Sequence, residues 1–202
     1  FLSGSKSTLS NKALGNLKEA INYYNKAIEI DSDHINSHYN LGTTFYQVRE
    51  LKKAKSSFQK VIEMNNKHAL AFFGLANVHA DLKEFENALS CYQKAIEINP
   101  KLIGAHNNLG LTFRALNDLK NAIICYQKVI EMKPDHAGTH HNLAAAFKEL
   151  GEFGKAIKSH EGAIKYEPEN AAHYYYLSEL KKEIINSETK NKIEKIVKNK
   201  NA

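Results

Sequence analysis

Apolar residues recur along the chain at helical spacing, interrupted by short polar breaks. In one representative stretch, Leu109, Phe113 and Leu116 lie three or four residues apart. After a break at "ND", the same spacing resumes and includes Ala122 and Tyr126. Such spacing is typical of an amphipathic helix with one buried face. The pattern therefore predicts two helices joined by a tight turn, which form an antiparallel pair.

This two-helix pattern returns every 34 residues. Position 1 of successive units falls on Ile35, Ala69, Ile103, Ala137 and Ala171. Leu always occupies position 7, a small residue position 8 and Ala position 20, while Pro occupies position 32 in three units. Small residues let the two helices of a pair approach closely, and Pro ends the second helix. Because one pair cannot bury both of its faces, we expect the pairs to stack.

The period divides the chain into four complete units and two atypical ends. The complete units are 35–68, 69–102, 103–136 and 137–170. At one end we expect a partial first unit, 1–34, with its second helix at 15–34. At the other end we expect capping helices in 171–202: a helix over 171–185, then a short helix capped by Ser187. Since the chain begins with Phe1 rather than Met, we expect it to be a piece of a longer protein.

The period and the Leu, small-residue, Ala and Pro positions resemble those of the tetratricopeptide repeat (TPR) family. The resemblance covers the four complete units and departs at position 4, where the family often has Trp and this chain has His, Phe or Tyr. It implies an all-α, right-handed superhelical solenoid of antiparallel helix pairs. It also implies a scaffold that binds a partner protein or an extended peptide in a concave groove lined by the first helices.

By the same resemblance, positions 5, 6, 9 and 12 are among those that face the groove. The candidate binding residues are Tyr39, Asn40, Phe73, Asn77, Asn108, Arg114, Asn142 and Lys148. Asn40, Asn108 and Asn142 form a row at position 6, interrupted by Gly74, similar to that in the TPR region of O-linked N-acetylglucosamine transferase. An amide both donates and accepts hydrogen bonds, so such a row can pair with a peptide backbone. Alternatively, these residues only hold local helix contacts.

The charge pattern argues against nucleic acid as the partner. The net charge is +6, but Lys and Glu interleave as in "YQKAIEINPK". A nucleic-acid interface would concentrate its Lys and Arg on one face, so an RNA-binding helical repeat is a disfavoured alternative. Arg114 and Lys148 could still attract an acidic group on a partner. No apolar run reaches the roughly 20 residues of a membrane span, and we expect a cytoplasmic protein with Cys91 and Cys125 reduced.

No motif in the sequence predicts catalysis, a cofactor or a metal. His34 and His38, like His136 and His140, have a spacing that suits zinc on a helix, but each pair straddles a turn between units, so we expect packing roles. One further alternative comes from "AAHYYYLSELKKEI", which is similar to segments that join TPR arrays to catalytic domains. It would make the chain the substrate-recruiting arm of a larger bacterial glycosyltransferase or sulfotransferase.

The sequence at the N-terminal end of the array predicts exposed apolar surface. The helix at 15–34 is apolar on more than one side, and the residues before it are too polar to replace a full first helix. We therefore expect open apolar surface beside Leu17 and Tyr24, and possible self-association through this end.

Overall fold

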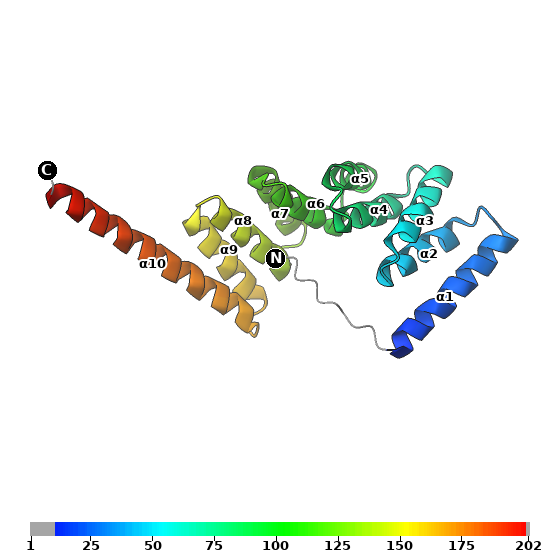
Figure 1. Cartoon of the computed structure of the whole chain (residues 1–202), viewed down its shortest axis with the longest axis horizontal. Coiled ribbons are helices and arrows are strands. Elements are labelled where there is room, and N and C mark those ends of the chain that lie inside the picture. Colours follow the sequence, from blue (N-terminus) through cyan, green and yellow to red (C-terminus); the bar gives the residue numbers. More distant parts are fainter. Residues whose placement is uncertain (1–10, 201–202) are drawn as a thin grey trace. The chain divides into compact units, whose positions relative to one another are not determined.

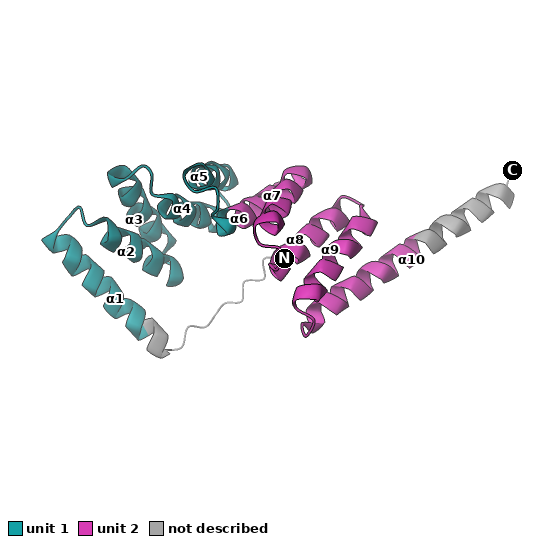
Figure 2. Cartoon of the chain, turned by 180° about the vertical axis from the view of Figure 1, so that it is seen from behind, with its two compact units in different colours: residues 1–105 teal, residues 106–202 magenta. Residues whose placement is uncertain are grey.

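The computed structural model describes residues 11–200, with the side chains of residues 15–187, and every element in this part is a helix (Figure 1). The chain is an all-α helical-repeat solenoid, as predicted. Its helices form two compact units, residues 1–105 and 106–202 (Figure 2). The helices are α1 (Asn11–Ile30), α2 (Ile35–Gln47), α3 (Leu51–Met64), α4 (Ala69–Asp81), α5 (Phe85–Ile98), α6 (Ile103–Ala115), α7 (Leu119–Met132), α8 (Ala137–Glu149), α9 (Phe153–Tyr166) and α10 (Ala171–Lys200).

Each complete 34-residue repeat contains a first helix of 13 residues and a second helix of 14. The first helices begin at position 1 of their units. The turn between the two helices always places position 15 in the left-handed region: φ is +65° at Arg49, +61° at Lys83 and Asn117, and +80° at Gly151. A single left-handed residue breaks the helical hydrogen bonding, so the chain reverses without a long loop.

Histidine side chains cap three of the first helices. The Nδ1 atoms of His34, His68 and His136 accept hydrogen bonds from backbone N–H groups three residues later, at 3.3, 3.0 and 3.2 Å. These bonds satisfy donors that the first turn of a helix leaves without partners. A ring nitrogen that accepts carries no proton, so these caps require an unprotonated Nδ1.

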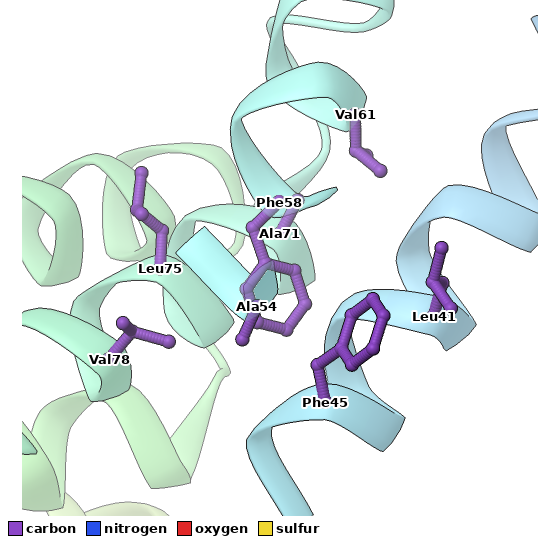
Figure 3. Packing of buried hydrophobic residues seen from close by; sticks show 8 residues of the cluster. All are labelled: Leu41, Phe45, Ala54, Phe58, Val61, Ala71, Leu75 and Val78. Atoms are coloured by element: carbon purple, nitrogen blue, oxygen red, sulfur yellow. The ribbon is translucent and has the colours of Figure 1, made fainter. Parts of the chain in front are cut away.

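The core of unit 1 centres on Phe58, whose ring is only 2% exposed. Figure 3 shows its side chain, which comes from α3, between the side chains of α2 and α4. A methyl group added at Gly42 would lie 3.0 Å from this ring, and one added at Gly74 would lie 2.5 Å from it. The close approach at Gly42 explains why position 8 is small, and the one at Gly74 restricts position 6 of the next repeat. The cluster comprises Leu41, Phe45, Ala54, Phe58, Val61, Ala71, Leu75 and Val78.

Unit 2 repeats this packing with Tyr126 in the place of Phe58. A methyl group at Gly110 would lie 2.6 Å from the Tyr126 ring, which is fully buried. Leu180 of α10 joins the same core and is 1% exposed, so α10 packs as the first helix of a further repeat. The remaining members of the cluster are Ala122, Ile123, Leu143, Ala146, Phe147 and Ala156.

The two ends differ from expectation in their helix boundaries. α1 covers Asn11–Ile30 rather than 15–34, because a lone Gly15 is tolerated within a helix and position 30 ends every second helix. The predicted break at Ser187 was wrong, because α10 continues to Lys200. The Ser187 hydroxyl donates to the Ile184 carbonyl at 2.8 Å, within the helix, instead of capping a new one.

The apolar surface expected on α1 is present but lies partly on other residues. Leu17 and Tyr24 are half-buried, and Tyr24 packs against the core of unit 1. Tyr23 and Ile30 are the strongly exposed apolar side chains, at 70% and 89%. Residues 1–10, which the expectation also concerned, lie outside the described residues.

Candidate functional site

A connected group of amides lies at positions 5 and 6 of the first helices in unit 2. Asn107 is at its centre. The Asn107 Nδ2 donates to Asn108 Oδ1 at 3.2 Å, and the Asn107 Oδ1 accepts from Asn142 Nδ2 at 3.3 Å. The buried hydroxyl of Thr139 also donates to Asn107 Oδ1, at 3.0 Å. We call Asn107, Asn108 and Asn142 the amide cluster of unit 2.

The amide cluster joins α6 to α8 and leaves part of each side chain accessible. All three Asn residues are half-buried. The Asn142 Oδ1 accepts no hydrogen bond from the part of the chain that the structure describes. An amide held by one neighbour keeps its orientation and can still offer its remaining donor or acceptor to a ligand. The cluster thus makes the local contacts considered for Asn at position 6, and its contact with a ligand stays a prediction.

Aromatic side chains continue this surface on α10. Tyr175 and Tyr176 occupy positions 5 and 6 there and are 61% and 44% exposed. The Tyr176 ring centroid lies 4.5 Å from that of His141, which precedes Asn142 on α8. We call the amide cluster together with His141, Tyr175 and Tyr176 the first-helix face of unit 2. This face offers amides at one end and aromatic rings at the other.

The two predicted cations of unit 2 already have partners within the chain. The Arg114 guanidinium donates to both carboxylate oxygens of Glu149, at 2.6 to 3.1 Å. Lys148 pairs with Glu183 at 2.6 Å. Hydrogen bonding to Glu149 raises the pKa of Arg114. Each cation is therefore balanced by a carboxylate of the next first helix, and its attraction for an acidic group on a partner stays a prediction.

Both ion pairs join position 12 of one 34-residue repeat to position 13 of the next repeat. In unit 1 the same two positions hold Tyr46 and Asp81. Burial first, and then the hydrogen bond with Asp81, raise the pKa of Tyr46 to about 12. The contacts connect successive first helices, so they stabilise the stacking of repeats.

The predicted site residues in unit 1 are used mainly in packing. The Tyr39 ring lies 5.1 Å from that of His68, and the Phe73 ring lies 6.1 Å from that of Tyr92. The Tyr92 hydroxyl donates to Asn77 Oδ1 at 2.7 Å. Asn40 is half-buried, and its backbone carbonyl accepts from Thr44. The structure thus brings Asn108 and Asn142 together through Asn107, whereas Asn40 belongs to the other compact unit.

A buried histidine cluster in unit 2 was missed by the sequence analysis. The His141 ring lies 5.5 Å from that of His160 and 6.4 Å from that of His173. Tyr176 stacks on His160 at 6.1 Å with an angle of 10° between the rings. The missed signal was His160 at position 24, where other units carry Tyr or Phe. Burial first, and then the neighbouring histidines, lower the pKa of His160 to about 4.

The histidine pairs considered as zinc ligands have other contacts. His34 and His136 cap helices, as described above. The Nε2 atoms of His38 and His140 bond to the carbonyls of Ser32 and Pro134, at 2.9 and 2.8 Å. Among the described residues, no group of three or more His, Cys, Asp or Glu side chains could hold a metal ion.

One cavity in unit 1 is lined by none of the predicted site residues. It has a volume of about 450 Å³, and Phe72 and Ile98 form its apolar part. Its polar lining comes from Asn66, Lys67, Lys94 and Glu97, and Lys94 and Glu97 pair with each other at 2.8 Å.

None of the described helices is both long enough and apolar enough to cross a bilayer.

Models of the tetratricopeptide repeat match most of the chain. The matched residues are 12–48, 35–68, 69–102, 104–136 and 125–158. They span α1 to α9 with little interruption. No curated protein matches the sequence.

Several solved structures share this fold. MamA is 24% identical, covers 80% of this chain and 94% of its own, and superposes with a TM-score of 0.74. YrrB, described as a TPR protein with an unusual peptide-binding site, is 24% identical over 82% of this chain and 85% of its own, with a TM-score of 0.69. A thermophilic TPR protein from Thermus thermophilus is 17% identical over 84% of this chain and 92% of its own, with a TM-score of 0.65. At these identities the likeness establishes the fold.

Proposed function

Because the chain belongs to the tetratricopeptide repeat family, a family of protein-interaction scaffolds, we propose that it holds an extended segment of a partner protein on the first-helix face of unit 2. The observation that carries the proposal is the amide cluster. Three amides on two helices are hydrogen-bonded to one another, so their orientation is set before a ligand arrives. Preorganised groups lose less conformational entropy on binding.

The chemistry of the face favours a backbone ligand over a charged one. Amides pair with peptide N–H and C=O groups whatever the side chains are. The nearest cations, Arg114 and Lys148, are neutralised by Glu149 and Glu183. A partner carboxylate would have to displace these intramolecular pairs, so it would gain little. We therefore propose a largely uncharged segment as the ligand.

The aromatic end of the face supports a second feature of the ligand. Tyr175 and Tyr176 expose more than two-fifths of their surface. Tyr side chains combine apolar contact area with a polar tip and are enriched at protein interfaces. A ligand that extends from the amide cluster toward α10 would place an apolar or aromatic side chain there. The description of YrrB as a peptide-binding TPR protein is consistent with a ligand of this kind.

Affinity selection can test this function without a known partner. Random 12-residue peptides displayed on phage would be selected on the immobilised chain, and the Kd of the enriched peptides measured by calorimetry. We expect the double variant Asn108→Ala, Asn142→Ala to bind them roughly tenfold more weakly, because each lost hydrogen bond is worth about 0.5–1.5 kcal/mol. Circular dichroism would verify that the helices are intact.

A matched control replaces an amide elsewhere. Asn87→Ala removes an exposed Asn from a second helix, α5, and should leave peptide affinity unchanged. Equal affinity of the wild type and the double variant would contradict the role of the amide cluster. A library that yields no binder would contradict the extended-peptide ligand itself.

A further inference from the structure

Three helices of unit 2 contribute one imidazole each to a common buried cluster. His141 comes from α8, His160 from α9 and His173 from α10. His160 and His173 are 5% and 6% exposed. Tyr176 of α10 lies over this cluster, 4.5 Å from the His141 ring and stacked on His160. The contact of α10 with the rest of the unit therefore includes three titratable rings.

We propose that this cluster is a pH-sensitive latch: it holds α10 on α8 and α9 while His141 and His160 are neutral, and proton uptake by these two rings in mildly acidic solution releases α10. Tyr175 and Tyr176, the aromatic end of the first-helix face of unit 2, would leave with the helix.

If these imidazoles took up further protons, the new N–H groups would find no hydrogen-bond acceptor among the described residues. The Nδ1 atoms of His141, His160 and His173 are all buried and have no hydrogen-bond partner among the described residues. A neutral imidazole can leave one nitrogen unprotonated, but both nitrogens of an imidazolium carry protons. A second or third charge in this cluster would therefore place a cationic N–H group in an apolar site without a partner, which is costly.

The charged groups around the cluster are mainly cationic or already paired. Glu167 is the exception, because its Oε2 lies 3.0 Å from His173 Nε2 and can balance one positive charge. Arg114 and Lys148 oppose a charge on His141 and His160 respectively, even though each has its own carboxylate partner. The groups that face the cluster are Arg114 from α6, His141 and Lys148 from α8, His160 from α9, Glu167 from the α9–α10 turn, and His173 and Tyr176 from α10.

The direction of the pH dependence follows from linkage. Burial first, and then neighbouring positive groups, lower the pKa of His160 to about 4 and also lower the pKa of His141. A released histidine has a pKa of about 6.5, so the released state binds more protons between pH 6.5 and 4. The latch is fully stabilising above pH 6.5 and weakens as the pH falls. For His160 alone, the equilibrium constant for release should rise roughly 30-fold between pH 7.5 and 5.

α10 is the element expected to move, because most of its described residues, 171–187, are exposed. It packs on α9 through the core residue Leu180, while Tyr174, Tyr175 and Ile185 remain exposed. α8 and α9 pack on each other as a pair and do not depend on α10 for that contact. Elements with few buried apolar contacts open at lower free energy than those at the centre of a core.

Hydrogen exchange followed by mass spectrometry can test the latch on the whole chain. Protection of residues 171–187 would be measured between pH 7.5 and 5 and corrected for the intrinsic pH dependence of exchange. We expect protection in α10 to fall at least tenfold more than in α7, which belongs to the same unit and contains no histidine. Equal protection of α10 at both pH values would overturn the proposal.

A substitution separates the histidine cluster from a general effect of acid. His160→Tyr introduces the residue that Tyr92 and Tyr126 provide at the same position, and should remove most of the pH response of α10. His34→Asn is the control: it removes an imidazole from unit 1, keeps a capping side chain, and should respond like the wild type. An unchanged response in His160→Tyr would refute the latch.

The wild-type chain offers a readout that needs no variant. Proton NMR of the histidine ring protons should show His160 titrating well below pH 6.5, together with the loss of α10 protection. A titration midpoint near 6.5 with α10 still protected would also refute the proposal, even if His160→Tyr failed to fold.

Discussion

At the scale of single residues, Phe58 explains why the row of Asn at position 6 is broken at Gly74. A methyl group at Gly74 would lie 2.5 Å from the Phe58 ring, closer than any real contact, and Asn would need still more room. In unit 2 the ring at the corresponding position of the preceding repeat belongs to Tyr126, and Asn142 is accommodated. In this chain the side chain at position 6 is therefore limited by the placement of the aromatic ring at position 24 of the preceding repeat.

The prediction from this contact is that Gly74→Ala lowers the free energy of unfolding by about 1–3 kcal/mol, because overpacking displaces the buried Phe58. The matched control is Gly154→Ala in α9, where a methyl group meets nothing within 4 Å. There, better helix propensity should raise stability by about 1 kcal/mol. Urea denaturation measures both changes. Loss of stability of the same size in both variants would show that propensity, rather than Phe58, governs these sites.

At this scale the sequence predicted two of the three members of the amide cluster as candidate binding residues. Asn108 and Asn142 stand out because their position repeats. Asn107, the centre of the amide cluster, does not, because position 5 holds Tyr39, Phe73, Asn107, His141 and Tyr175 in turn. The partners of Arg114 and Lys148 were missed because they lie about 35 residues away, on the following first helix.

At the scale of helices, one junction in unit 1 replaces an apolar contact with polar groups. Position 11 holds Phe in three complete units and His79 in the fourth, and position 21 holds Lys55 where the other units have Ile or Leu. Glu84 connects the two: its Oε2 lies 2.5 Å from His79 Nδ1 and 3.1 Å from Lys55 Nζ. His79, then Lys55, lower the pKa of Glu84 through these hydrogen bonds.

Because the other repeats place apolar side chains at these two positions, we predict that Lys55→Ile and His79→Phe together raise the free energy of unfolding at neutral pH by burying more apolar surface. Each single variant leaves Glu84 with one of its two partners and should gain less than the pair does. A double-mutant cycle by urea denaturation measures the coupling. A double variant less stable than the wild type would show that the network stabilises the junction, and strictly additive effects would show that the two positions are not coupled.

Helix boundaries show what local pattern can and cannot predict. The first helices begin where the period places them, since helix caps and left-handed turns recur with it. α10 departs from the period, because Ser187 forms a hydrogen bond within its own helix and nothing in the sequence between Ala171 and Lys200 forces a break. A serine before an apolar run is compatible with either outcome.

At the scale of the molecule, the two compact units carry different surfaces. Unit 1 uses its predicted site residues largely for packing, whereas unit 2 combines the amide cluster, two neutralised cations and exposed tyrosines. The period alone predicted the all-α repeat fold. It did not predict which repeats carry the amide cluster, because that depends on residues at positions where the repeat varies.

The most direct test of the account is NMR of side-chain amides in the ¹⁵N-labelled chain, titrated with a peptide selected on it. If the amide cluster holds the ligand backbone, the Nδ2 resonances of Asn107, Asn108 and Asn142 should shift on binding. Those of Asn87 and Asn121, which lie on second helices, should not. Saturable binding that leaves the amide cluster unshifted, with the largest changes on second helices or at Asn66 in the cavity, would contradict the proposed site.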